Sequence, residues 1–264
     1  VIVMLFIGIL LKMVMQKSIL YACILLAVVQ FSQKALSQSD SLHHRDKISL
    51  ELLQIKESQN GGHVFTGSQL QYAHEWAWEG SEAVSTLKSQ IGAGAVFSRG
   101  ILGVNFHLMP AEWLYKWKVT PSLFIGTVLA ADYNYQLYPE LQSGVSYWFS
   151  QFSAGLAAEY RFQALENNWR VMGTTSLLGL TSRPPEVRSP YFFDLGFGEA
   201  LRYLHQNIGF GSVNQFSRTR FEVQWQANNT GNNEPIRLSY TFDIDAYFYL
   251  PQWIALRHGL TLTF

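Results

Sequence analysis

Charged side chains that could pair with one another recur at alternate positions in several segments of the sequence. The densest group falls in two stretches near the end of the chain and comprises Arg237, Asp243, Asp245 and Arg257. The same pattern upstream adds Glu75, Lys88, His107, Glu159, Arg161 and Glu222. If these side chains face one interior, the opposite charges must pair to be tolerated away from water. We predict an internal charge network, and a polar conduit or ligand site is the alternative.

Other residues that could do chemistry are few. His43, His44 and Asp46 could bind a metal, but we favour a short polar segment exposed to solvent. The chain has one cysteine, Cys23, which excludes a disulfide framework and a thiolate metal site. There is no phosphate-binding loop, dinucleotide fingerprint or zinc-protease motif. We therefore predict no metal and no cofactor.

The composition restricts the class of protein. Of the 264 residues, 48% are hydrophobic, 15% are aromatic and 14% are charged, and the net charge is zero. Soluble domains carry roughly a quarter charged residues. A soluble protein this poor in charge would need a very large core, whereas lipid can solvate an apolar outer face. The absence of a basic run gives no reason to expect a nucleic-acid partner.

The charged residues lie in segments where apolar and polar side chains alternate, which indicates β-strands. In 254–264, for example, leucines and Phe264 share one face and Arg257 shares the other with threonines. Many of these segments reach about ten residues, the length of a tilted strand that spans a membrane. Aromatic residues gather near strand ends, as at the two interfaces of a membrane barrel. They are Trp76, Trp78, Trp113, Trp117, Tyr133, Tyr135, Tyr247 and Phe248.

The last nine residues carry a more specific pattern. Leu256, Leu260, Leu262 and Phe264 alternate with polar residues and end on an aromatic side chain. This segment resembles the C-terminal signature of bacterial outer-membrane β-barrels, although His258 departs from it at a position that is usually apolar. The resemblance implies a closed antiparallel transmembrane barrel in the outer membrane. It also implies two partners, namely outer-membrane lipid and the barrel assembly machinery, while any envelope protein partner stays open.

A coarse division of the chain gives an even number of strands, as single-chain bacterial barrels prefer. The twelve candidates are 47–56, 63–78, 85–97, 101–109, 118–135, 141–149, 152–163, 169–181, 192–206, 217–227, 235–248 and 253–264. Segment 141–163 reads as one long strand or as two, and ten is the next best count of strands. We predict one all-β barrel domain over 47–264, preceded by a polar lead-in over 38–46.

The N-terminal segment 1–37 is mostly apolar and has no acidic residue. Lys17 precedes a second apolar run and Ala35-Leu36-Ser37 follows it, which is typical of a cleaved signal peptide. We predict cleavage before Gln38, with residues 1–14 as an upstream extension. A lipoprotein site at Cys23 and a membrane anchor over 18–31 are the alternatives.

One segment raises the question of an enzyme. His205-Gln206-Asn207-Ile208-Gly209, followed by Ser217, resembles the His-Gln-Ser-Asn-Gly segment of outer-membrane phospholipases A. Asn207 stands where that family has its nucleophilic serine, so the weak candidates for catalysis are His205, Ser212 and Ser217. We expect a non-enzymatic barrel that is a small channel or a structural component of an envelope complex. A lipid-modifying hydrolase, of the phospholipase or lipid A deacylase type, is the alternative, and a soluble β-protein is a third.

Overall fold

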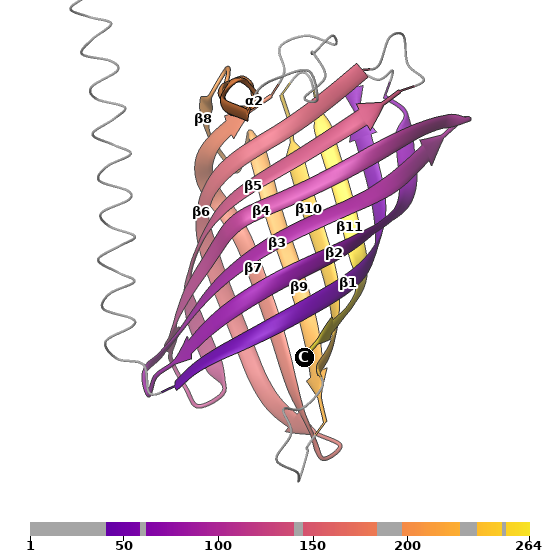
Figure 1. Ribbon diagram of the computed structural model, residues 1–264. Helices are drawn as coiled ribbons and strands as arrows, with labels where there is room; N and C mark the ends of the chain where they lie inside the picture. Colours follow the sequence, from indigo (N-terminus) through magenta and orange to yellow (C-terminus); the bar gives the residue numbers. More distant parts are fainter. Residues whose placement is uncertain (1–40, 59–61, 140–144, 184–196, 228–236, 250–251) are drawn as a thin grey trace, which may run out of the picture.

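The structure, a computed structural model, describes residues 41–58, 62–139, 145–183, 197–227, 237–249 and 252–264 (Figure 1). The expected signal peptide over 1–37 lies outside the described residues. The elements are β1 (Ser41–Glu57), β2 (Val64–Glu79), β3 (Ala83–Ser98), β4 (Ile101–Lys118), β5 (Leu123–Tyr138), β6 (Val145–Ala164), β7 (Asn167–Ser182), α2 (Phe197–Leu204), β8 (Gly209–Ser212), β9 (Phe216–Gln226), β10 (Arg237–Tyr247) and β11 (Trp253–Thr263). In the described ranges, no helix is both long and apolar enough to cross a membrane.

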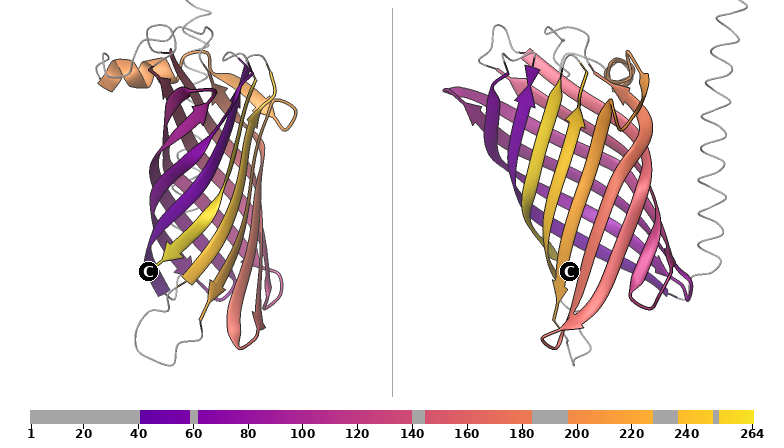
Figure 2. Two further views of the ribbon diagram at one scale, coloured as in Figure 1. Left: turned by 90° about the vertical axis from the view of Figure 1, so that its right-hand side faces the viewer. Right: turned by 180° about the vertical axis from the view of Figure 1, so that it is seen from behind.

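Ten long strands form a closed antiparallel barrel, visible from three sides in Figures 1 and 2. The first strand, β1, pairs with the last, β11, from Lys47 opposite Thr263 to Glu57 opposite Trp253. The pairing of β6 with β7 completes the ring. Each long strand therefore has a hydrogen-bonded neighbour on both sides, as closure requires. The closed antiparallel barrel expected from the alternation is confirmed.

The expected count of twelve strands is wrong, and ten is correct. Segments 141–149 and 152–163 belong to one strand, β6, in which Ser150 and Gln151 keep their pairing to both neighbours. Segment 192–206 contains the helix α2 instead of a strand. Its acidic Glu199 in the first turn and basic Arg202 in the last turn favour a helix through the helix dipole.

Two further strand boundaries differ from expectation. β1 begins at Ser41, so residues 41–46 of the expected polar lead-in are part of the barrel wall. β4 continues to Lys118, beyond the expected end at 109, because a bulge between Leu108 and Ala111 accommodates Pro110. The short strand β8 pairs with the upper part of β7, from Leu178 to Thr181.

The two faces of the wall have opposite chemistry. Outward-facing leucines are exposed, including Leu50 at 62%, Leu70 at 60% and Leu260 at 57%. The inward-facing side chains beside them, such as Glu51 and Gln69, are polar and buried. A soluble sheet buries its apolar face, whereas a membrane barrel turns that face to lipid. Along these parts of the strands, the barrel thus has an apolar surface outside and polar side chains inside.

Candidate functional site

The interior of the barrel holds most of the chemically competent side chains. We call the end where β1 begins and β11 ends the lower end, and the end near α2 the upper end (Figure 1). Inward-facing positions lie at every second residue of each strand, so ten strands together supply several layers of side chains. From the lower end upward, these layers are charged, then charged and amide-rich, then apolar.

In the lowest layer, two glutamates, Glu75 and Glu159, each lie beside several cationic side chains. Glu75 accepts a hydrogen bond from Lys47 Nζ at 2.5 Å and from Arg45 Nη1 at 3.1 Å. Because Lys47 and Arg45 lie on β1 and Glu75 on β2, these contacts tie neighbouring strands together.

A second glutamate joins strands further round the ring. Glu159 pairs with Lys116 of β4 and accepts from Arg161 Nε at 2.5 Å. Arg170 of β7 lies 3.9 Å from Glu159 and donates to Glu222 of β9 at 2.6 Å. The resulting chain of ion pairs runs along one side of the ring, from β4 over β6 and β7 to β9.

Above this layer, Arg220 of β9 bridges the lumen. Its Nη1 donates to both carboxylate oxygens of Glu112 on β4, at 2.9 and 3.2 Å. Its Nε and Nη2 donate to Asp243 Oδ2 on β10, at 3.2 and 2.9 Å. Since β4 and β9 are not neighbours in the sheet, this bridge spans the interior between opposite walls.

A third charged layer surrounds Arg218. The guanidinium lies 3.1 Å from Asp132 and 3.7 Å from Asp245. Asp245 also pairs with Arg257, and His107 Nε2 lies 3.0 Å from Asp132 Oδ2. The side chains of Asp132, Asp245 and His107 have no exposed surface. A buried charge removed from water is tolerated because an opposite charge compensates it.

The upper part of the lumen is filled by apolar side chains, which we call the upper plug. The plug consists of Leu53, Ile55, Phe65, Val96, Tyr138, Tyr147, Phe149, Phe216, Trp253 and Ala255. Ring centroids lie 4.8 Å apart for Phe149 and Trp253, and 4.6 Å apart for Phe65 and Tyr138. These rings close the interior between the charged layers and the upper rim.

A buried ion pair between Arg183 and Glu57 lies against the upper plug. Arg183 follows the end of β7 and Glu57 is the last residue of β1. The Arg183 guanidinium also lies over the rings of Phe149, at 5.9 Å, and Tyr247, at 5.5 Å. Such cation–π contacts stabilise a charge that is removed from water.

The charged layers contain a small cavity. A cavity of about 20 Å³ lies between side chains such as Ser49, Gln90, Arg220 and Ser239. About one water molecule needs roughly 10–15 Å³ of such volume. The cavity can therefore hold a water molecule but no larger solute.

The structure distributes the charges singled out from the sequence over several layers. Glu159, Glu222, Asp243, Asp245 and Arg257 all lie in the buried network. Arg161, half-buried, lies at its lower edge. Arg237 is at the lower end of β10, opposite Gln226 and Thr263, and six positions before Asp243.

Several members of the network were not expected from the sequence. They are Lys47, Glu51, Glu112, Lys116, Asp132, Arg170, Arg218 and Arg220. The signal for Arg218 and Arg220 was present, because both continue the face of Glu222 toward the start of β9. Glu112 and Lys116 lie beyond the bulge at Pro110, where the alternation changes phase.

The weak catalytic candidates lie on separate elements. His205, just after α2, contacts outward-facing side chains of β5 and β6: Tyr133 Oη is 3.0 Å from its Nε2, and the Phe152 ring is stacked at 5.9 Å. Ser212 belongs to β8, and Ser217 on β9 lies 3.4 Å from Thr219 Oγ1. The described contacts of His205 thus include two aromatic side chains of the outer wall.

The histidines near the start of β1 are separated by the strand itself. His43 and His44 are consecutive, so their side chains point to opposite faces of the wall. On the outer face, Asp46 Oδ1 accepts hydrogen bonds from Tyr72 at 2.5 Å and from His74 Nδ1 at 2.8 Å. Among the residues that the structure describes, no group of three potential ligands is arranged to hold a metal ion.

The C-terminal signature lies on the outer face as the alternation requires. Leu260, Leu262 and Phe264 are exposed there, and Leu256 shares their face. The backbone of Phe264 exchanges two 3.0 Å hydrogen bonds with Asp46, so the last residue closes the barrel seam. His258 also faces outward, and its Nδ1 lies 3.4 Å from the hydroxyl of Tyr240 on β10.

No family model and no curated protein matches the sequence. Solved structures of similar fold include the outer-membrane protease OmpT of Escherichia coli, at 10% identity and a TM-score of 0.44, covering 83% of this chain and 94% of that one. The β-domain of the Bordetella autotransporter BrkA has 14% identity and a TM-score of 0.41, covering 85% and 100%. A deletion mutant of the monoaromatic hydrocarbon channel TodX has 8% identity and a TM-score of 0.37, covering 85% and 90%. These neighbours are outer-membrane β-barrels, and at such identities the likeness concerns the fold alone.

Proposed function

We propose that the chain is an integral outer-membrane β-barrel that acts as a structural component of the envelope, with a lumen closed to solutes. The observation that carries this proposal is the filled interior. Paired charges occupy its lower and middle layers and an apolar plug occupies its upper part. A small channel and a structural component were both expected from the sequence, and the filling favours the second.

The outer face supports a location in lipid. Leu50, Leu70 and Leu260 would each forgo roughly 1.5–3 kcal/mol of burial free energy if they faced water. Many other large apolar side chains are exposed on the same surface. The C-terminal signature, with Phe264 at the seam, supports insertion by the barrel assembly machinery into the outer membrane.

The ion pairs argue against a conducting path. An ion that crossed the lumen would have to displace contacts such as those of Arg220 with Glu112 and Asp243. It would then meet the rings of Phe149 and Trp253, which cannot replace the water molecules that coordinate an ion. The cavity of about 20 Å³ among the charged side chains of the described residues is too small to hold a hydrated ion.

Conductance measurements test the proposal directly. The purified barrel, reconstituted in planar bilayers, should show no steady single-channel current. A variant with Phe149→Ala, Trp253→Ala and Arg220→Ser, which empties part of each layer, should give measurable openings and shows that the assay can detect a pore. Reproducible openings from the unaltered protein would overturn the closed-lumen proposal.

A further inference from the structure

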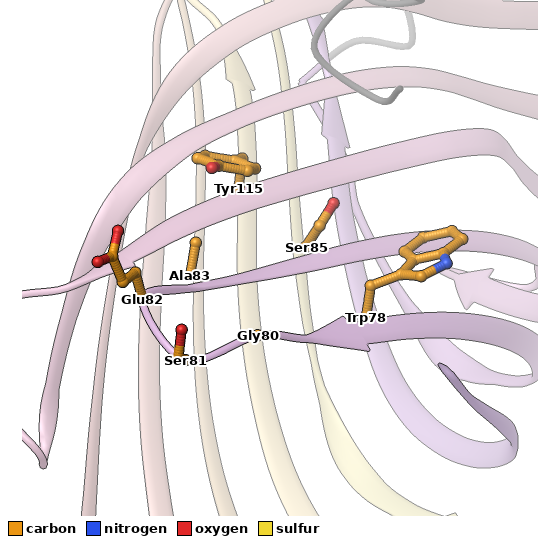
Figure 3. Close-up of a pocket in the computed structure, with 7 residues that line it drawn as sticks. All are labelled: Trp78, Gly80, Ser81, Glu82, Ala83, Ser85 and Tyr115. Atoms are coloured by element: carbon orange, nitrogen blue, oxygen red, sulfur yellow. The ribbon is translucent and has the colours of Figure 1, made fainter. Parts of the chain in front are cut away.

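A groove opens on the outer wall at the lower end of the barrel, beside the turn between β2 and β3 (Figure 3). It encloses about 290 Å³, far more than the cavity in the lumen. Its position outside the lumen makes it independent of the charge network.

The groove results from a small residue between two large ones. Ser85 of β3 pairs with Trp78 of β2 on one side and with Tyr115 of β4 on the other. Directly opposed residues in neighbouring antiparallel strands project from the same face of the sheet. The two aromatic side chains therefore form the walls, and Ser85 forms the floor (Figure 3).

Hydrogen bonds hold this frame in place. Ser85 Oγ accepts a hydrogen bond from Trp113 Nε1 at 2.8 Å. Because this bond uses only a lone pair of the oxygen, the hydroxyl hydrogen of Ser85 can donate to a ligand. At the turn, Gly80 N donates to Ala83 O at 2.9 Å, and Lys118 N donates to Glu82 O at 2.8 Å. The groove is thus built on paired strands and a hydrogen-bonded turn.

One carboxylate stands at the mouth of the groove. The side chain of Glu82 is exposed, and within the described part of the chain it makes no ion pair. Glu79, by contrast, lies near the cations Arg161, at 3.5 Å, and Arg45, at 4.0 Å. The groove therefore offers two aromatic faces and a carboxylate that forms no ion pair with the described residues, a combination that attracts an ammonium group.

We propose that this groove binds the ammonium headgroup of a zwitterionic phospholipid that carries a primary amine. The proposal rests on the membrane location proposed above. The neighbouring outward-facing aromatics Trp113 and Trp117 mark the level of an interface, where headgroups and not acyl chains lie. The ammonium would lie between Trp78 and Tyr115, close to Glu82.

Native mass spectrometry of the full-length barrel in detergent provides the test. The protein is titrated with phosphatidylethanolamine or with phosphatidylglycerol, and the fraction that retains a lipid is measured. The unaltered protein should retain phosphatidylethanolamine at concentrations where phosphatidylglycerol is lost. Glu82→Gln should weaken this retention roughly two- to fivefold, the range for an exposed charge pair.

A steric variant and two controls separate the groove from general lipid binding. Ser85→Leu should abolish the preference, because it fills the floor without changing charge. Glu166→Gln, in the exposed turn between β6 and β7 at the same end, and Tyr240→Leu, on the outer face of β10, should retain it. Free ethanolamine in excess should compete poorly if the whole lipid is bound. Efficient competition would contradict the lipid proposal and identify a soluble amine as the ligand.

Two results would overturn the proposal. One is equal retention of both lipids by the unaltered protein, and the other is unchanged retention in Glu82→Gln and Ser85→Leu. Either could occur in a barrel that is inserted and non-conducting, so failure here is distinguishable from failure of the proposed function.

Discussion

Arg220 offers the sharpest test of the internal charge network. The substitution Arg220→Met keeps an apolar stem of similar length and removes the cation from four hydrogen bonds to Glu112 and Asp243. Removing one partner of a buried pair costs about 3–5 kcal/mol, because the remaining charge is left uncompensated. Glu112 still has an ion pair with Arg218, at 3.4 Å, in this variant. Most of the lost free energy of unfolding should therefore come from the uncompensated charge of Asp243.

The second step of this test restores neutrality. Adding Asp243→Asn to Arg220→Met removes the stranded charge, and it should recover more than half of the lost free energy of unfolding. Urea unfolding of the barrel in lipid vesicles, followed by tryptophan fluorescence, measures each variant. Arg99→Met, in the exposed β3–β4 turn, is the control and should change stability by less than about 0.5 kcal/mol. The reasoning is refuted if Arg220→Met unfolds like the control, or if the double variant is no more stable than the single one.

Three further substitutions test the seam, the upper plug and the segment after α2. Phe264→Ala should reduce the yield of folded barrel in outer-membrane fractions severalfold, seen as loss of the heat-modifiable band on gels. Trp253→Ala should lower the free energy of unfolding by about 3–5 kcal/mol through the cavity it leaves, whereas lipid-facing Trp117→Ala should cost clearly less. His205→Ala should leave lipid hydrolysis at background and speed proteolysis around 197–212, because the contact with Tyr133 is lost; a loss of measurable hydrolase activity would contradict this expectation.

Much of the wall could be predicted from alternation, because a strand that faces lipid on one side and a polar lumen on the other repeats every two residues. The C-terminal strand is the clearest case, with Leu260 and Phe264 outside and Arg257 inside. Alternation misleads where the inward face becomes apolar. In β1, Leu52 faces lipid, but Leu53 and Ile55 then enter the upper plug while the polar Gln54 faces outward, so the pattern reverses its polarity there.

The partners within the lumen could not be predicted, because they depend on distances across the barrel. Arg220 and Glu112 are 108 positions apart in the chain and come from opposite walls. The bulge at Pro110 also reverses which residues of β4 face inward, and alternation before the bulge does not reveal the change. Arg237 shares a strand with Asp243, yet six positions along a strand correspond to roughly 20 Å at about 3.4 Å per residue.

Cysteine labelling in lipid vesicles tests most directly whether the lumen is filled and the outer face lies in lipid. In a Cys23→Ser background, single cysteines replace Ser239 in the lumen, Leu70 on the outer face and Leu165 in the turn at the lower end, which is 87% exposed. A water-soluble maleimide should label Leu165→Cys rapidly and leave Ser239→Cys and Leu70→Cys unmodified, whereas a lipid-soluble reagent should label Leu70→Cys. Labelling of Ser239→Cys by the water-soluble reagent at the rate of Leu165→Cys would show an open lumen and contradict the account.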